Sequence, residues 1–199
     1  IAGPTDGIMV PIPQYPLYSA SIAMYRGRLV PYCLDEADGW RLSEAMLEEA
    51  YAQAQAAGTQ VKAICVINPG NPTGAVLDEA NIRMVLAFAE PHGLTVLADE
   101  VYQENIYQAG AQFVSFARVH HEMGLKDVTL FSFHSCSKGL LGECGVRGGY
   151  LEYRNLPDDV AAQILKLQSI ALCANLTGQA AVYAMVKTPK PGMPSYQAY

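Results

Sequence analysis

The chain has 199 residues, of which 51% are hydrophobic and only 16% charged, and its formal net charge is −6. This amount of apolar side chain is enough for one sizeable core, so we expect a single globular domain. The acidic balance argues against nucleic acid as a partner, because a phosphate backbone requires clustered lysine and arginine. No apolar stretch is long enough to span a bilayer, so no membrane partner is expected.

The sequence holds five scattered cysteines and no CxxC pair; they are Cys33, Cys65, Cys136, Cys144 and Cys173. This pattern predicts neither a metal site nor a disulfide framework, and we expect most of the thiols to be small buried hydrophobes in a reducing compartment. The sequence begins IAGPTDG without an initiator Met and ends PGMPSYQAY. We interpret it as an internal part of a longer protein.

Short apolar runs alternate with longer amphipathic ones, which predicts strands separated by helices. In chain order the predicted elements are a strand at 7–13, a short helix that Gly27 ends, a strand at 27–34, a helix at 42–58, a strand at 61–67, a helix at 77–93, strands at 94–100, 127–133 and 148–153, and a helical stretch over 157–187 with a break near Asn175 and Gly178. Ser43 and Asp78 are expected to cap the two long helices, and Gly58 to end the first. Strands separated in this way imply parallel β-α-β crossovers, so the predicted fold class is α/β, with a mostly parallel sheet between two layers of helices.

In sheets of this kind, ligands bind beyond the carboxyl ends of the strands. The strand at 61–67 is followed there by NPGNPTG (68–74). Asn, Pro and Gly are also ordinary turn residues, but this run of seven indicates a rigid loop that holds its two asparagines in fixed directions. We interpret the loop as part of a site.

The next two strands also end in polar residues. Asp99, in ADEVY, emerges from a buried strand, and burying a carboxylate without a partner is costly; taken alone, it is better explained as a solvent-facing capping residue. The strand at 127–133 ends in SFHSCSK, where Ser135 and Ser137 precede Lys138, and Arg147 follows nine positions after the lysine. Hydroxyl donors beside a lysine and an arginine favour an anion site.

These residue types together fit one cofactor, pyridoxal 5′-phosphate. A lysine forms a Schiff base with its aldehyde, a carboxylate holds its protonated pyridine nitrogen, and serine with arginine holds its phosphate. The predicted site residues are Tyr15, Asn71, Asp99, Tyr102, Ser135, Ser137, Lys138 and Arg147.

We assign each of these residues a role. Lys138, Asp99 and Tyr102 are the predicted catalytic residues: the lysine forms the Schiff base and the carboxylate holds the ring nitrogen. Tyr102 and Asn71 are expected to donate to the ring 3′ oxygen, and Tyr15 to lay its face against the ring. The two serines and the arginine are the predicted phosphate ligands, the arginine because its planar fork matches a phosphate.

Several other polar residues are assigned structural roles. His134 lies on a strand end, where histidine is more often a hydrogen-bonded structural residue than a base. His120 and His121, with Glu122, are interpreted as the solvated face of a short helix rather than as a metal site. Glu100 is expected to be paired or solvated.

The chain resembles the class I/II aminotransferases of the fold-type I pyridoxal-phosphate enzymes. NPGNPTG, ADEVY and SxSK followed by GxRGGY occur in the order of that family. More narrowly, PIPQYPLYSA, CVINPGNPTG, ADEVYQENIY and SFHSCSKGLLGECGVRGGY are similar to the alanine aminotransferase branch, which includes the glutamate:glyoxylate aminotransferases. The resemblance implies the same eight site residues in the same roles, with Lys138 also shuttling the proton. It further implies that 1–187 is an incomplete large pyridoxal-phosphate-binding domain, and 188–199 the start of the connection to a small domain.

The resemblance also implies groups that lie outside the sequence. A second phosphate-binding turn is expected before Ile1, and the arginine that grips the substrate carboxylate after Tyr199. The intact protein is expected to be a homodimer that acts on an amino acid and a 2-oxo acid, and the 199-residue piece alone to be inactive. The expected compartment is the cytoplasm, the mitochondrion or the peroxisome.

Three functional interpretations are open. The first is transamination between L-alanine and 2-oxoglutarate, giving pyruvate and L-glutamate, or between the related pair glutamate and glyoxylate. The second is another pyridoxal-phosphate reaction, such as a β-lyase or an aminocyclopropane-forming synthase, because a fold does not fix a reaction. The third is an inactive homologue kept for oligomerisation, against which the intact set of Lys138, Asp99, Tyr102 and Arg147 argues. We favour the first.

Overall fold

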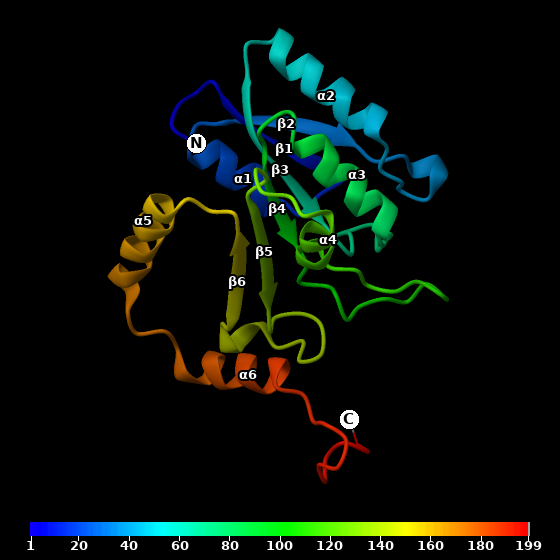
Figure 1. Cartoon of the computed structure of the whole chain (residues 1–199), viewed down its shortest axis with the longest axis vertical. Coiled ribbons are helices and arrows are strands. Elements are labelled where there is room, and N and C mark those ends of the chain that lie inside the picture. Colours follow the sequence, from blue (N-terminus) through cyan, green and yellow to red (C-terminus); the bar gives the residue numbers. More distant parts are fainter. Residues whose placement is uncertain (199) are drawn as a thin grey trace.

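The computed structural model describes residues 1–198. Its strands are β1 (Asp6–Ile12), β2 (Arg28–Cys33), β3 (Gln60–Ile67), β4 (Thr95–Asp99), β5 (Leu130–Ser135) and β6 (Gly149–Arg154). Its α-helices are α1 (Leu17–Met24), α2 (Glu44–Ala56), α3 (Glu79–Ala89), α4 (Phe116–Met123), α5 (Asp158–Gln168) and α6 (Leu176–Val186). Within residues 1–198 the strands form one six-stranded sheet in the order β2-β1-β3-β4-β5-β6 (Figure 1).

The first five strands pair in parallel and only β6 runs antiparallel, against β5. The predicted class, α/β with a mostly parallel sheet, is therefore confirmed. The antiparallel pair follows from the connection, because β5 and β6 are joined by the segment 136–148, which holds no α-helix to carry the chain back across the sheet.

The sheet is covered on both faces, as the alternation along β3 shows. Ile64 and Val66 belong to the main core under α2, α3 and α4, whereas Cys65 and Ile67 belong to a smaller cluster with Ile22 of α1. Successive side chains of a strand point to opposite faces. The continuous apolar run of β3 is thus explained by burial on both sides.

Local signals start the two long helices close to where the sequence predicts them, and α3 ends at Ala89, earlier than the predicted 93. The Ser43 hydroxyl accepts the N–H of Met46 at 3.4 Å, and the Asp78 carboxylate accepts the N–H of Asn81 at 2.8 Å. Gly58 has a φ of +70°, which a glycine adopts without steric cost. Both predicted caps and the predicted end of α2 are confirmed.

The fifth strand begins later than predicted, at Leu130 rather than at 127. The carbonyl oxygen of Val128 accepts from Nε2 of His120 at 2.9 Å, and the Thr129 hydroxyl donates to the carbonyl of Asn155. These contacts tie the two residues to a helix and a turn. The interpretation of both adjacent histidines as a solvated face is wrong for His120, which is buried, whereas His121 is exposed.

The five cysteines are free thiols, and only Cys65 and Cys136 are buried. The expectation that most of them are buried is therefore wrong. None of the helices in residues 1–198 combines the length and the apolar character needed to cross a bilayer.

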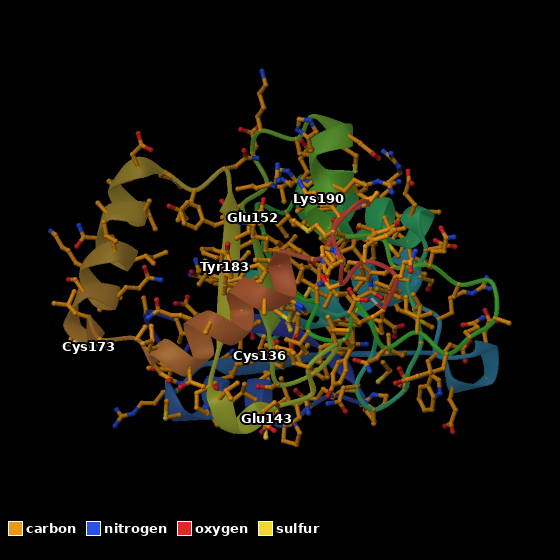
Figure 2. The ribbon with its side chains drawn as sticks, turned by 90° about the horizontal axis from the view of Figure 1, so that it is seen from below. Cys136, Glu143, Glu152, Cys173, Tyr183 and Lys190 are labelled. Carbon is orange, nitrogen blue, oxygen red and sulfur yellow. The ribbon has the colours of Figure 1, made fainter. Side chains whose placement is uncertain are left out.

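The C-terminal helices lie outside the main core. The predicted break near Asn175 separates α5 from α6. Helix α5 buries none of its residues and stands at one side of the molecule, with Cys173 just beyond it, while α6 crosses the end of the sheet (Figure 2).

Candidate active site

The loops that follow β3, β4 and β5 meet at one edge of the sheet, because these three strands are adjacent and parallel (Figure 1). Two side-chain contacts join the loops. The Asn71 amide donates to the hydroxyl oxygen of Tyr102 at 3.1 Å, and the Asn105 side chain accepts the N–H of Gly139 at 3.0 Å. The sequence segments singled out as a site therefore lie side by side.

The loop 68–74 holds its two asparagines in different environments. Asn68 is fully buried, and its side-chain oxygen accepts the N–H of Leu77 at 2.9 Å, so it fixes the loop to the following segment. The loop closes on itself through a backbone hydrogen bond from Gly74 to Gly70. Asn71 is half-buried and reaches Tyr102. Of the two, only Asn71 faces the predicted site.

Lys138 lies in the turn after β5 and is exposed. Its Nζ lies 5.6 Å from the centre of the Tyr102 ring, within the range of a cation–π contact. Tyr102 therefore stands between Asn71 and Lys138. The structure brings these three predicted residues together.

Asp99 is the last residue of β4 and is half-buried. Its Oδ2 accepts a hydrogen bond from the hydroxyl of Tyr18 at 2.5 Å, and its Oδ1 accepts the N–H of Val101 at 3.4 Å. Burial raises the pKa of Tyr18 far above its usual value, with Cys65 and Asp99 adding to the effect, so the phenol stays protonated and remains a donor. The sequence did not single out Tyr18.

Tyr15 lies just before α1 with 48% of its surface exposed. Its stacking against a ring stays a prediction. The tyrosine that reaches the site residues in this structure is Tyr18, three positions further along.

The predicted phosphate ligands lie on either side of the turn after β5. The Ser135 hydroxyl accepts the N–H of Ser137 at 3.3 Å. Arg147 has a φ of +55° and is exposed, and its Nη1 donates to the carbonyl of Cys144 at 2.7 Å. Within residues 1–198 no hydrogen bond joins the arginine to the two serines, so their shared role as phosphate ligands stays a prediction.

Helix α6 packs against the turn that carries Arg147 (Figure 2). The Asn175 amide donates to the carbonyl of Val146. Gly178 comes so close that a Cβ there would lie 2.8 Å from the Val146 oxygen and 3.0 Å from the Arg147 oxygen. The missing side chain of Gly178 therefore lets the helix support the backbone of the predicted phosphate-binding arginine.

Two buried polar residues, Glu100 and His134, support the site through hydrogen bonds. Glu100 is 3% exposed and accepts from the Ser132 hydroxyl and from the N–H of Phe116, the latter at 2.8 Å. Burial raises the pKa of its carboxyl group. His134 lies 3.2 Å from the Glu100 carbonyl oxygen through Nδ1 and 3.0 Å from the Gln103 amide through Nε2. The prediction of a hydrogen-bonded, structural role for His134 is confirmed. Glu100, expected to be paired or solvated, is buried and paired with two neutral donors.

An open groove of about 800 Å³ runs beside Asp99 on the α1 face of the sheet. Asp99, Ser135 and Tyr18 supply polar groups to its wall, and Leu97 and Leu151 supply part of an apolar floor. Asn71, Tyr102 and Lys138 lie outside this groove. Among the described residues, no three His, Cys, Asp or Glu side chains gather as metal ligands.

The sequence as a whole matches a family model described as aminotransferase class I and II over residues 1–198. The chain belongs to this family. It is 52% identical to alanine aminotransferase 1, mitochondrial, and 52% identical to glutamate–glyoxylate aminotransferase 1, both from Arabidopsis thaliana, over its whole length in each case. It spans 37% of the first protein and 42% of the second, so it covers about two fifths of the length of these relatives.

Solved structures of aminotransferases share the fold. An alanine aminotransferase from Pyrococcus furiosus superposes with a TM-score of 0.78 at 30% sequence identity, over 94% of this chain and 44% of that one. An aminotransferase from Escherichia coli gives 0.77 at 27% identity, over 96% and 45%. These likenesses confirm the predicted α/β fold with a mostly parallel sheet, shared with fold-type I aminotransferases of which this chain covers a little less than half.

Proposed function

We propose that this aminotransferase chain holds pyridoxal 5′-phosphate and serves, within the whole protein, transamination between L-alanine and 2-oxoglutarate. One observation carries the proposal. Tyr102 contacts both Asn71 and Lys138, at the same edge of the sheet at which β4 ends in Asp99. The name and the 52% identity of the Arabidopsis alanine aminotransferase support this choice of substrates.

The residues at this edge fit the proposed cofactor. A carboxylate, a tyrosine–asparagine pair, two serine hydroxyls, a lysine and an arginine are the partners that a pyridine nitrogen, a ring hydroxyl, a phosphate and an aldehyde require. They come from three neighbouring loops, and Asp99 and Ser135 line the same groove. When bound, the cofactor withdraws electrons from the substrate α-carbon, which makes its proton removable.

The chain’s own groups have separate tasks in this proposal. Asp99 holds the ring nitrogen in its protonated form. Asn71 donates to the hydroxyl oxygen of Tyr102, which leaves the tyrosine proton free to be donated onward to the ring oxygen. Lys138 would hold the cofactor through its amine, and the same amine, when free, would take up and return the proton of the substrate α-carbon. Serines 135 and 137, with Arg147, hold the phosphate.

A second candidate is transamination between glutamate and glyoxylate. It is favoured by the glutamate–glyoxylate aminotransferase from Arabidopsis, which is as similar to this chain as the alanine enzyme. In both cases the partners are an amino acid and a 2-oxo acid. We further propose that 1–187 belongs to the large domain, that 188–199 leads toward a small domain, and that the intact protein is a homodimer. The mitochondrial name of one relative supports a mitochondrial location.

The decisive experiment is made on the full-length protein. We expect pyridoxal phosphate to give a visible Schiff-base band and, after borohydride reduction, a label on Lys138. Lys138→Ala should lose both the label and transamination. Lys126→Ala is the control, because this exposed lysine precedes β5 and lies at the opposite edge of the sheet. A label on another lysine, or normal turnover by Lys138→Ala, would refute the assignment.

Substrate choice is read from the same preparations. Turnover with alanine and 2-oxoglutarate well above turnover with glutamate and glyoxylate supports the first candidate, and the reverse order supports the second. Failure of both pairs with a correctly labelled Lys138 would contradict transamination of either kind.

A further inference from the structure

The hydrogen bond between Tyr18 and Asp99 joins a helix on one face of the sheet to the end of β4, across 81 positions of sequence. Its length of 2.5 Å is short for a hydroxyl donor and falls in the range of bonds to an ionised carboxylate. Such charge-assisted bonds are stronger than neutral ones. Tyr18 therefore holds the carboxylate of Asp99, a predicted catalytic residue, through a strong hydrogen bond.

The surroundings of Tyr18 hold its hydroxyl in place. Its ring packs against the small apolar cluster that contains Ile22, Cys65 and Ile67, together with Leu97. A tyrosine with its ring in an apolar cluster has few alternative partners for its hydroxyl, so the bond to the carboxylate is the one it keeps. The raised pKa of Tyr18 keeps the proton on the phenol throughout the neutral range.

The second hydrogen bond to the Asp99 carboxylate is weak. Oδ1 accepts only the N–H of Val101, at 3.4 Å, which is beyond the usual range for such bonds. Without the phenol, little would stop the carboxylate from turning about its last side-chain bond. An ionised carboxylate has about four acceptor positions, so the two protein donors leave positions open for a further partner. The hydrogen bond from Tyr18 sets the direction in which these open positions point.

We infer that Tyr18 is a positioning residue, which orients the carboxylate of Asp99 toward the pyridine nitrogen of the cofactor. This inference rests on the proposed function. It gives the second tyrosine of PQYPLY a task that differs from stacking, because Tyr18 acts on the ring only through Asp99.

The test uses two variants of the full-length protein loaded with pyridoxal phosphate. Tyr18→Phe keeps the ring and removes only the hydroxyl. Tyr32→Phe is the matched control, because the Tyr32 hydroxyl is also buried and donates to the carbonyl of Cys65 at 2.7 Å, but does not touch Asp99. Each variant loses one hydrogen bond of a tyrosine hydroxyl, partly buried for Tyr18 and buried for Tyr32, so a general loss of stability appears in both.

The main readout is the nitrogen NMR shift of a cofactor labelled with ¹⁵N in its ring. For Tyr18→Phe we expect the shift to move from the protonated toward the neutral position, and kcat to fall about tenfold or more with KM changed less than about threefold. Tyr32→Phe should leave the shift and kcat near those of the unmodified protein.

Two outcomes would overturn the inference. One is an unchanged ring-nitrogen shift in Tyr18→Phe. The other is an equal change in both variants, which would mean that Tyr18 acts only through stability. Failure of the proposed function is recognised separately, because the unmodified protein would then show no label on Lys138 after borohydride reduction.

Discussion

Glu100 offers a sharp test of how the site is braced. This carboxyl group is 3% exposed, and two elements depend on it, because it accepts the N–H of Phe116 at the start of α4 and the hydroxyl of Ser132 in β5. In Glu100→Ala the buried N–H would lose its acceptor, at about 1–3 kcal/mol, and the half-buried hydroxyl would lose a bond worth about 0.5–1.5 kcal/mol. We expect the free energy of unfolding to fall by about 1.5–4.5 kcal/mol.

Glu100→Gln separates the charge from the contacts. Its amide oxygen can still accept from Phe116, and its amide nitrogen can donate to the oxygen of Ser132, at nearly equal volume. Burial raises the pKa of Glu100 in the folded protein, so the folded state binds more protons than the unfolded state. The stability that this group contributes is therefore fully present below its unfolded pKa and is lost as the pH rises through the folded pKa. Gln has no such loss.

The assay is urea unfolding of the full-length protein and both variants at about pH 4.5 and about pH 8. We expect Glu100→Gln to gain stability relative to the unmodified protein between the lower and the higher pH. Glu100→Ala should be the least stable of the three at both. Two results would show that the reasoning about this carboxyl group is wrong. One is a stability of Glu100→Gln, relative to the unmodified protein, that does not change with pH. The other is a stability of Glu100→Ala within about 0.5 kcal/mol of that of the unmodified protein.

Three further predictions concern other parts of the chain. Asp99→Asn should slow proton abstraction in a stopped-flow half-reaction more than it weakens cofactor binding, and an unchanged half-reaction rate would contradict the role of Asp99. Gly178→Ala must move α6 away from the turn that carries Arg147, because its Cβ would lie 2.8 Å from a carbonyl oxygen; we expect weaker cofactor binding by fluorescence titration, and an unchanged Kd would count against the support by α6. Arg83 and Glu122, 3.1 Å apart and about 40% exposed, should show a coupling of only about 0.2–1 kcal/mol in a double-mutant cycle, smaller at high salt, and a coupling that ignores salt would contradict this.

The parts of the fold that the sequence predicts are those governed by local chemistry. Helix α2 begins after Ser43 and ends before Gly58 because a hydroxyl cap and a glycine at positive φ act within a few residues. The buried strand β3 is visible from its apolar run. The loops that hold Asn71 and Lys138 can be predicted to form a site, because each follows such a strand. Parallel strands bring their carboxyl ends to one edge of the sheet.

The parts that the sequence does not predict depend on distant partners. The late start of β5 reflects the hydrogen bond between His120 and the carbonyl of Val128, and the burial of His120 is set by the same contact. Helical spacing places His120 four positions after the buried Phe116, on the same face of α4, whereas the exposed His121 lies off that face. The sequence does not show the partner of the His120 ring, which is the carbonyl of Val128. The exposed thiols of Cys33, Cys144 and Cys173 likewise follow from where their segments lie on the surface.

The role of Tyr18 depends on a distant partner, Asp99, but the sequence PQYPLYSASI contains a local pattern that indicates it. Tyr18 and Ile22 are four positions apart and so share one face of the short helix α1, the face that packs on the sheet. A tyrosine on such a face has its ring in the core and needs a polar partner for its hydroxyl. The parallel strands place their carboxyl ends within reach of this helix, and the acidic residue at that edge is Asp99. The pattern thus indicates that Tyr18, rather than the exposed Tyr15, is the tyrosine that acts on the carboxylate.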